Sequence, residues 1–244
     1  MTELAPRLSA AHRKALPLLA SGVPEPSVVG YLDLLDPAPV PAPNRAQALW
    51  SRRWGAAFYA NLQSMRRRLM DVNGSPRDRL RPAPGETVLD LGCGPGDITR
   101  QLADAVTSSG LVVGVDLSAE MLTRAVRDAS AGNIAFFRGD ATRLPFSDGM
   151  FDAVCCSAMF QLLPDPFAAL DAMTRVLAPG GRVFILTTHR GRGLAERLSC
   201  ALVGRLSGAR MFAPSAIPDA LAERGYRDID QRFTGMLQTV VAVR

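Results

Sequence analysis

Short apolar runs alternate with amphipathic stretches along the chain from residue 81 to its end. Apolar runs bounded by turn residues are typical of strands that are buried on both faces. Stretches in which apolar residues recur every three or four positions are typical of helices that cover a sheet. The expected strands lie near residues 87–91, 111–116, 134–138, 151–157 and 182–188. The expected helices lie near residues 97–107, 118–130, 166–177 and 214–224, which predicts an α/β fold with a doubly wound, mostly parallel sheet.

The chain closes with a different pattern. Residues 226–234 and 237–243 are two strand-like runs, and Gly235-Met236 separates them. Two strands joined by so short a connection form a hairpin. We therefore expect an antiparallel strand at one edge of the sheet.

The first 80 residues contain two short helical stretches, Ser9 to Ala20 and Ser27 to Leu35, and the proline-rich linker 36–43. A longer helix is expected after Asn44, with an apolar stripe formed by Trp50, Trp54, Phe58, Leu62, Met65 and Leu69. Its other side is basic, with Arg52, Arg53, Arg66, Arg67 and Arg68. We divide the chain into an N-terminal helical extension or lid, 1–80, and a folded domain, 81–244.

Charge narrows the range of partners. The formal net charge is +5. Residues 1–80 hold 11 basic and 6 acidic side chains, whereas residues 81–244 hold 17 of each. Phosphate binding needs a concentrated basic face, so a neutral domain argues against nucleic acid as the partner. The basic N-terminal helix leaves a weak contact with a membrane surface open.

The cysteines argue against metal and disulfide chemistry. The chain has four, Cys93, Cys155, Cys156 and Cys200, with no Cys-x-x-Cys pair and only two histidines. We expect no metal site and reduced thiols, as in a cytoplasmic protein. The apolar stretch 15–20 is too short, and too broken by Pro17, for a secretion signal, and no run approaches the length of a membrane span.

The most informative stretch is 88–99, an apolar run that leads into a glycine loop and then a helix. Glycines at positions 92, 94 and 96 let a ligand approach bare backbone, and the following helix turns unpaired amides toward the loop. Asp116 ends the next strand about 20 residues beyond, where doubly wound folds place a ribose-binding carboxylate. Asp97 stands where a dinucleotide fingerprint has its third glycine, which disfavours an NAD(P)-dependent oxidoreductase without excluding it.

Five motifs, in order and at the right spacing, resemble class I S-adenosylmethionine-dependent methyltransferases. The resemblance covers about residues 80–244 and is closest to the branch that includes the menaquinone and ubiquinone C-methyltransferases. It implies a seven-stranded sheet of order 3-2-1-4-5-7-6 with strand 7 antiparallel. The five motifs are 88–96, 114–118 with Met121, 139–141 with 144–146, 151–154 and 175–181.

The resemblance implies that the methionine part of S-adenosylmethionine lies against the glycine loop. Gly92, Cys93 and Gly94 offer backbone atoms to it, and Asp90 helps to orient it. Ser157, just after the fourth strand, presents its carbonyl to the cofactor ammonium. Gly96 completes the loop.

The resemblance also assigns the ribose and the adenine. Asp116 takes both ribose hydroxyls, while Leu117 and Met121 pack around the adenine. Asp140 accepts from the adenine amine, and the Ala141 amide donates to the ring. Tyr59, in the N-terminal third, reaches the cofactor if that segment closes over the site.

The acceptor side is less defined. Met159, Phe160 and Leu163 form an apolar pocket wall, although Phe160 suits the core equally well. His189 follows the fifth expected strand and is the candidate general base, with a surface histidine beside Arg190 and Arg192 as the alternative that stays open. Residues 159–164 lack the histidines that quinone-type members often carry there, and 157–160 lack the Asn/Asp-Pro-Pro-aromatic motif of amino methyltransferases.

These observations predict methyl transfer to a small, apolar or aromatic acceptor, at carbon or oxygen. The cofactor carries its own electrophile, so the protein mainly aims a nucleophile and excludes water. A non-catalytic cofactor-binding or interaction module stays open as an alternative, because a cofactor site can persist without turnover.

Overall fold

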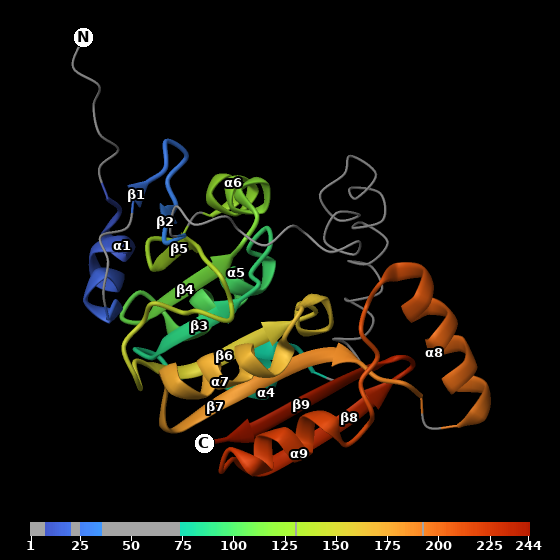
Figure 1. Cartoon of the computed structure of the whole chain (residues 1–244). Helices are drawn as coiled ribbons and strands as arrows, with labels where there is room; N and C mark the ends of the chain where they lie inside the picture. Colours follow the sequence, from blue (N-terminus) through green and yellow to red (C-terminus); the bar gives the residue numbers. More distant parts are fainter. Residues whose placement is uncertain (1–7, 21–24, 36–73, 130, 192) are drawn as a thin grey trace.

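The computed structural model describes residues 8–20, 25–35, 74–129, 131–191 and 193–244. Within these ranges one sheet has the strand order β1-β2-β5-β4-β3-β6-β7-β9-β8 (Figure 1). Its strands are β1 (Glu25–Pro26), β2 (Leu32–Asp33), β3 (Thr87–Leu91), β4 (Leu111–Asp116), β5 (Ile134–Arg138), β6 (Phe151–Ser157), β7 (Leu177–Thr188), β8 (Arg227–Thr234) and β9 (Leu237–Val243).

The predicted fold class is confirmed, but the predicted count of seven strands is too low, because β1 and β2 extend the described sheet beyond β5. From β5 to β8 the seven strands that follow residue 80 have the order 3-2-1-4-5-7-6 when numbered along the chain. β3 to β7 are parallel, and β9 runs antiparallel to both of its neighbours. β7 is longer than the expected strand 182–188, since it starts at Leu177 and includes most of the motif 175–181.

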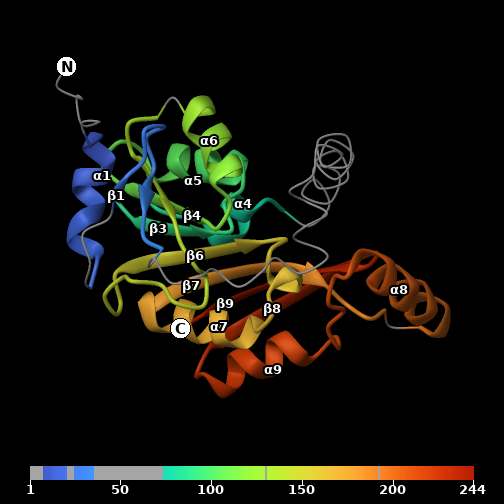
Figure 2. The same cartoon turned by 45° about the horizontal axis from the view of Figure 1, so that its top comes forward.

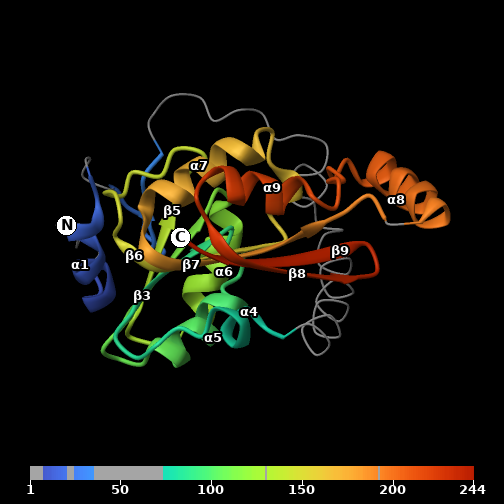
Figure 3. The same cartoon turned by 90° about the horizontal axis from the view of Figure 1, so that it is seen from below.

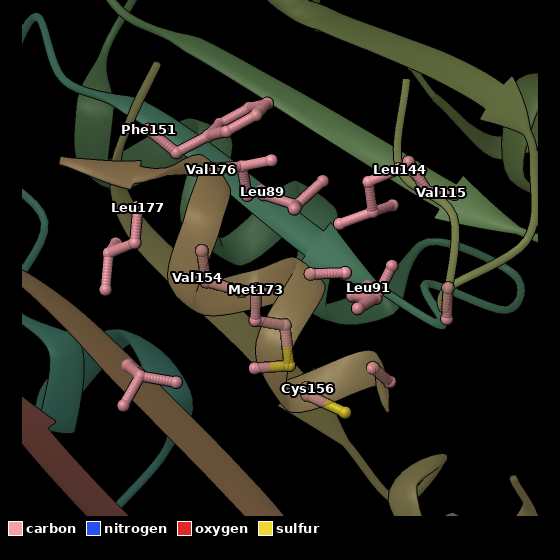
Figure 4. Close-up of a cluster of buried hydrophobic side chains, with 14 of the residues drawn as sticks. Leu89, Leu91, Val115, Leu144, Phe151, Val154, Cys156, Met173, Val176 and Leu177 are labelled. Carbon is pink, nitrogen blue, oxygen red and sulfur yellow. The ribbon is translucent and has the colours of Figure 1, made fainter. Parts of the chain in front are cut away.

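Helices cover both faces of the sheet, as Figure 3 shows. One face is packed by α4 (Pro76–Leu80), α5 (Asp97–Val106) and α6 (Ala119–Asp128), whose apolar residues share a cluster with alternate residues of β3 and β4. The other face is packed by α1 (Ala10–Ala15), α7 (Pro166–Val176) and α9 (Ala216–Glu223). Figure 4 shows the second core, where Leu89 and Leu91 lie with Met173 and Val176. The remaining described helices are the short helices η1 (Leu16–Leu18) and η2 (Phe160–Leu162) and the longer helix α8 (Leu194–Ser207).

The N-terminal third departs from its prediction. The serine cap is confirmed, because Ser9 accepts a hydrogen bond from the His12 amide at the start of α1. The helix expected over 27–35 is wrong: β2 instead pairs in parallel with β5, and β1 pairs with β2. The edge of β5 offers unpaired backbone groups, and pairing with them outweighs local helix propensity.

The expected linker 36–43 and the aromatic helix after Asn44 lie outside the described residues. The division at residue 80 therefore stays a prediction. In the parts that are described, the segment before it is joined to the sheet, because β2 is itself a strand of that sheet.

Helix α8 was not predicted. Its large apolar residues face outward, so its pattern does not match a helix that covers its own domain. All three whole-chain views show α8 extending beyond the ends of β6 and β7 (Figures 1 to 3). Among the described residues no helix is long and apolar enough to cross a membrane, and no cluster of histidine, cysteine or carboxylate side chains suits a metal ion.

Candidate cofactor-binding site

The loop between β3 and α5 carries three glycines in the left-handed region. Their φ angles are +74° at Gly92, +53° at Gly94 and +81° at Gly96. A Cβ added to Gly94 meets no atom of the described residues within 4 Å, so among these residues this backbone faces open space. That space is where a ligand can approach the chain closely, as the sequence predicts.

The loop is fixed to the end of β4 by backbone amides. Gly92 and Cys93 both donate to the Val115 carbonyl, at 2.8 and 3.1 Å. The Gly94 amide donates to Oδ2 of Asp116 at 2.9 Å. The glycine loop and the carboxylate predicted to bind ribose are therefore direct neighbours, although 22 residues separate them in the chain.

Asp116 is held from two sides. Its Oδ1 accepts from the Ser118 amide at 2.8 Å, just before α6 begins. Burial raises the pKa of Asp116, and the amide hydrogen bonds from Ser118 and Gly94 oppose that rise. The carboxylate is thus preorientated at the carboxyl end of the sheet before any ligand arrives.

The ends of β4 and β5 meet at the same edge. The Gly139 amide donates to the backbone carbonyl of Asp116 at 3.1 Å, which brings the following residues, Asp140 and Ala141, next to β4. Asp140 closes its own turn: its Oδ1 accepts from the amide and the hydroxyl of Thr142. Its Oδ2 faces Arg143 Nε at 3.4 Å.

Leu117 and Met121 flank this edge and are partly buried. The Leu117 carbonyl accepts from Arg138 Nε at 3.1 Å, and Arg138 also pairs with Asp33 of β2 at 3.1 Å. The sequence reasoning did not find the pair of Arg138 and Asp33. No local pattern links two residues 105 positions apart, and their contact follows from β2 joining the sheet.

Asp90 lies below the loop and is buried. Its Oδ2 accepts from the Thr99 hydroxyl at 2.6 Å, which ties the end of β3 to the first turn of α5. Cys93 is also buried, and burial together with Asp116 and Asp90 raises the pKa of its thiol well above the usual value. In this surrounding Cys93 stays a neutral thiol, which donates to the Gly94 carbonyl at 3.8 Å.

The end of β6 contains two unusual features. The Ser157 hydroxyl oxygen is buried and has no hydrogen-bond partner among the described residues. The next residue, Ala158, has a φ of +60°, which is uncommon for a residue other than glycine and is often found at functional sites. Gln161 Nε2 donates to the Ala158 carbonyl at 2.8 Å and holds this conformation. Nothing in the sequence indicates the strained Ala158.

Met159 lies directly over the glycine loop. A Cβ added to Gly92 comes within 2.7 to 2.9 Å of three Met159 side-chain atoms, so only glycine fits below this side chain. Leu163 is partly buried nearby. Phe160 is not a pocket wall: it is wholly buried and packs with Phe167 and Phe212, as expected for a core residue.

His189 is buried beyond the end of β7. Its Nε2 donates to the Gly235 carbonyl at 2.8 Å, and its Nδ1 accepts from the Gly191 amide at 3.0 Å. Both ring nitrogens are occupied by backbone groups, which favours a structural role over that of a general base. Tyr59, the remaining predicted site residue, lies outside the described residues.

The polar groups at this edge of the sheet fit a ligand that consists of a nucleoside linked to an amino acid. The carboxylate of Asp116 suits a pair of ribose hydroxyls, and the open face of Gly94 admits a ligand. The buried Ser157 hydroxyl has no hydrogen-bond partner in the part of the chain that the structure describes. Residues 88–181 match the family model of a methyltransferase domain. This segment therefore belongs to the class I methyltransferases, whose cofactor is S-adenosylmethionine.

Two curated methyltransferases are similar to this chain over part of its length. The 2-phytyl-1,4-naphtoquinone methyltransferase of Synechococcus elongatus is 45% identical over 111 residues, 44% of this chain and 48% of the relative. The demethylmenaquinone methyltransferase of Lactococcus lactis is 40% identical over 113 residues, 45% of each chain. The matched part thus spans about half the length of these relatives.

A solved structure shows the same fold over a larger part of the chain. It is a complex of the Haloferax volcanii Trm112 methyltransferase activator with a putative methyltransferase. The TM-score is 0.61 at 22% identity, over 77% of this chain and 94% of the matched chain. At this identity the likeness concerns the fold.

Proposed function

We propose that this protein transfers a methyl group from S-adenosylmethionine to a small, apolar, aromatic acceptor of the quinol type. The observation that carries the proposal is the convergence of the Gly94 backbone and the Asp116 carboxylate at the open carboxyl edge of the sheet. The named activities of the quinone methyltransferase relatives support the acceptor class.

In this proposal Asp116 holds the ribose hydroxyls, the open side of Gly94 receives the methionine part, and Ser157 presents its backbone carbonyl to the ammonium of the amino acid end. The cofactor supplies a methyl group on a positively charged sulfur. Met159 and Leu163 line the acceptor side, where apolar side chains exclude water from the transfer. Asp140 and Ala141 face the adenine, with Leu117 and Met121 beside it.

The acceptor side argues for an apolar ring. Ser157, Ala158 and Met159 present no side-chain amide or carboxylate that could hold a planar amine. His189 is occupied by backbone groups, so the proposal assigns it no proton transfer. An acceptor whose hydroxyl groups already make the ring nucleophilic places the smallest demand on a protein base.

The test is a methyl-transfer assay with labelled S-adenosylmethionine and the full chain. A reduced naphthoquinone with an isoprenoid tail is compared with a simple phenol and with a nucleobase, and Asp116→Ala is the control for the cofactor site. We expect label in the quinol alone. Tight binding of S-adenosylhomocysteine without transfer to any acceptor would instead support the cofactor-binding module.

A further inference from the structure

Helix α8 carries an exposed ridge of leucines. Leu194, Leu198, Leu202 and Leu206 recur every fourth residue and are exposed by 78%, 67%, 60% and 78%. Cys200, on the opposite side of α8, is buried, so the ridge points away from the body of the protein. With a rise of about 1.5 Å per residue the ridge is roughly 18 Å long. Leucines presented outward at this spacing mark an interaction surface.

The base of α8 is fixed. The Arg190 amide donates to the Phe212 carbonyl at 2.8 Å, and the Arg210 amide donates to the Gln161 carbonyl at 3.0 Å. The Thr188 hydroxyl also donates to the Arg210 carbonyl. The segment therefore leaves the end of β7 and returns close to it, so both ends of the segment that contains α8 are anchored. Figure 2 shows α8 projecting from this base.

Positive charge is concentrated around this ridge. Residues 190–213 contain five arginines and one acidic residue, Glu196, a net charge of +4. The other residues of 81–244 contain 12 basic and 16 acidic side chains, a net charge of −4. Arg197 and Arg205 of α8 are both exposed, in the same helix as the ridge.

Leucines beside arginines on one surface helix fit the boundary between lipid tails and anionic headgroups. Nucleic acid does not fit, because leucines contribute nothing to phosphate binding. α8 also follows the carboxyl end of β7, whose Leu186 pairs with Ser157, so the ridge lies at the same edge of the sheet as the cofactor site. A surface docked through α8 thus meets the protein on its site edge.

We propose that α8 docks this protein on an anionic phospholipid surface, with the leucine ridge inserted and Arg197 and Arg205 at the headgroups. The proposal is independent of methyl transfer, since docking needs neither cofactor nor acceptor. It concerns α8 alone, and so differs from a contact through the basic residues Arg66 to Arg68.

The test is vesicle flotation of the full chain, without cofactor, on phosphatidylcholine vesicles and on vesicles that also contain phosphatidylglycerol. We expect binding to the anionic vesicles that weakens with salt. Leu198→Gln with Leu202→Gln lowers this binding by more than about 10-fold, because apolar burial is lost. Arg197→Gln with Arg205→Gln lowers it by about 30-fold, at about 5-fold for each arginine.

Matched controls keep the test specific. Val28→Gln removes an apolar residue that is 94% exposed elsewhere, and Arg77→Gln with Arg124→Gln removes the same charge from α4 and α6. Both leave vesicle binding unchanged. Full binding in the leucine variant overturns the proposal and assigns the contact to another segment. A second outcome also overturns the proposal: the parent protein does not bind vesicles but is a dimer, and the leucine variant is a monomer. In that case the ridge joins two copies of this chain.

Discussion

The backbone amide of Gly94 donates to Oδ2 of Asp116 at 2.9 Å, and this bond joins the glycine loop after β3 to the end of β4. The loop and the carboxylate therefore form one unit. A change at Asp116 alters both the group predicted to bind ribose and the shape of the loop. Two consequences can be measured, one at fixed pH and one as a function of pH.

Asp116→Ala is expected to weaken binding of S-adenosylhomocysteine by about 10- to 150-fold. The estimate corresponds to about 1.5–3 kcal/mol for hydrogen bonds to a charged group. Titration calorimetry measures it, and Asp104→Ala, which removes an exposed carboxylate of α5, is the matched control. Equal affinities for the two variants, or tight binding of NADH by the parent protein, contradict the assignment.

The affinity for S-adenosylhomocysteine is expected to fall as the pH decreases. This fall should begin at a pH above 3.8, which is the pKa of an ordinary aspartate. Burial raises the pKa of Asp116 in the unliganded protein, whereas the bound ribose favours the ionised form. As the pH falls over the same interval, protonation of Asp116 raises the free energy of unfolding of the unliganded protein. The reason is that the folded state binds this proton more tightly than the unfolded state does. Calorimetry at a series of pH values measures the effect, and Asp116→Asn is expected to remove this step.

Most of the sheet could be predicted because each strand between Thr87 and Ser157 is a local apolar run bounded by turn residues. The pairing of Gly94 with Asp116 could be anticipated in the same way, since both follow parallel strands that end at one edge. The pairing of β2 with β5 could not, because a two-residue strand has no periodicity of its own. It forms only where another strand offers an unpaired edge.

The roles of several residues also could not be predicted from the local sequence pattern. The position of His189 after β7 suits a base, and only the three-dimensional contacts with Gly191 and Gly235 reveal that both nitrogens are occupied. Ala158 has a left-handed backbone that its residue type disfavours, and the bond from Gln161 holds it there. Such conformations depend on tertiary contacts, so propensity fails at these positions.

Thr99→Val is expected to lower the free energy of unfolding by about 1–3 kcal/mol. The substitution keeps the shape but removes the hydroxyl that donates to the buried Asp90 at 2.6 Å. Urea denaturation measures the change. Thr123→Val is the control, because the Thr123 hydroxyl bonds only within the exposed face of α6. Equal midpoints for the two variants would show that the bond between Thr99 and Asp90 contributes little.

His189→Ala is expected to lower the free energy of unfolding by about 1–3 kcal/mol, since the Gly191 amide and the Gly235 carbonyl lose a partner. His189→Gln should recover part of that loss, because its amide can donate to Gly235. Turnover below the unfolding transition is expected to persist in both variants, with an unchanged pH profile. A loss of turnover of more than about 100-fold in both, as expected for removal of a general base, would restore the catalytic assignment of His189.

Gly92→Ala is expected to destabilise the protein through two separable effects. A residue with a Cβ at a φ of +74° is strained by about 1–2 kcal/mol. The added Cβ also comes within 2.7 to 2.9 Å of the Met159 side chain. Met159→Gly removes the second effect and leaves the first, because the closest of these three atoms is Met159 Cβ, which alanine would keep. Gly92→Ala should therefore destabilise the Met159→Gly protein less than the parent. The expected coupling is at least about 1 kcal/mol, within the range found for residues in contact.

Gly94→Ala is the matched control for that coupling, because Gly94 has a φ of +53° and an added Cβ meets no described atom within 4 Å. It carries the backbone strain without the collision, so its effect on stability should be the same with and without Met159. Its new methyl group projects into the space assigned to the ligand, and binding of S-adenosylhomocysteine should therefore weaken. Urea denaturation of the three single and two double variants, together with calorimetry of Gly94→Ala, measures these effects. If Gly94 couples to Met159 as strongly as Gly92 does, the collision is not the cause, and Met159 acts by ordering the whole loop.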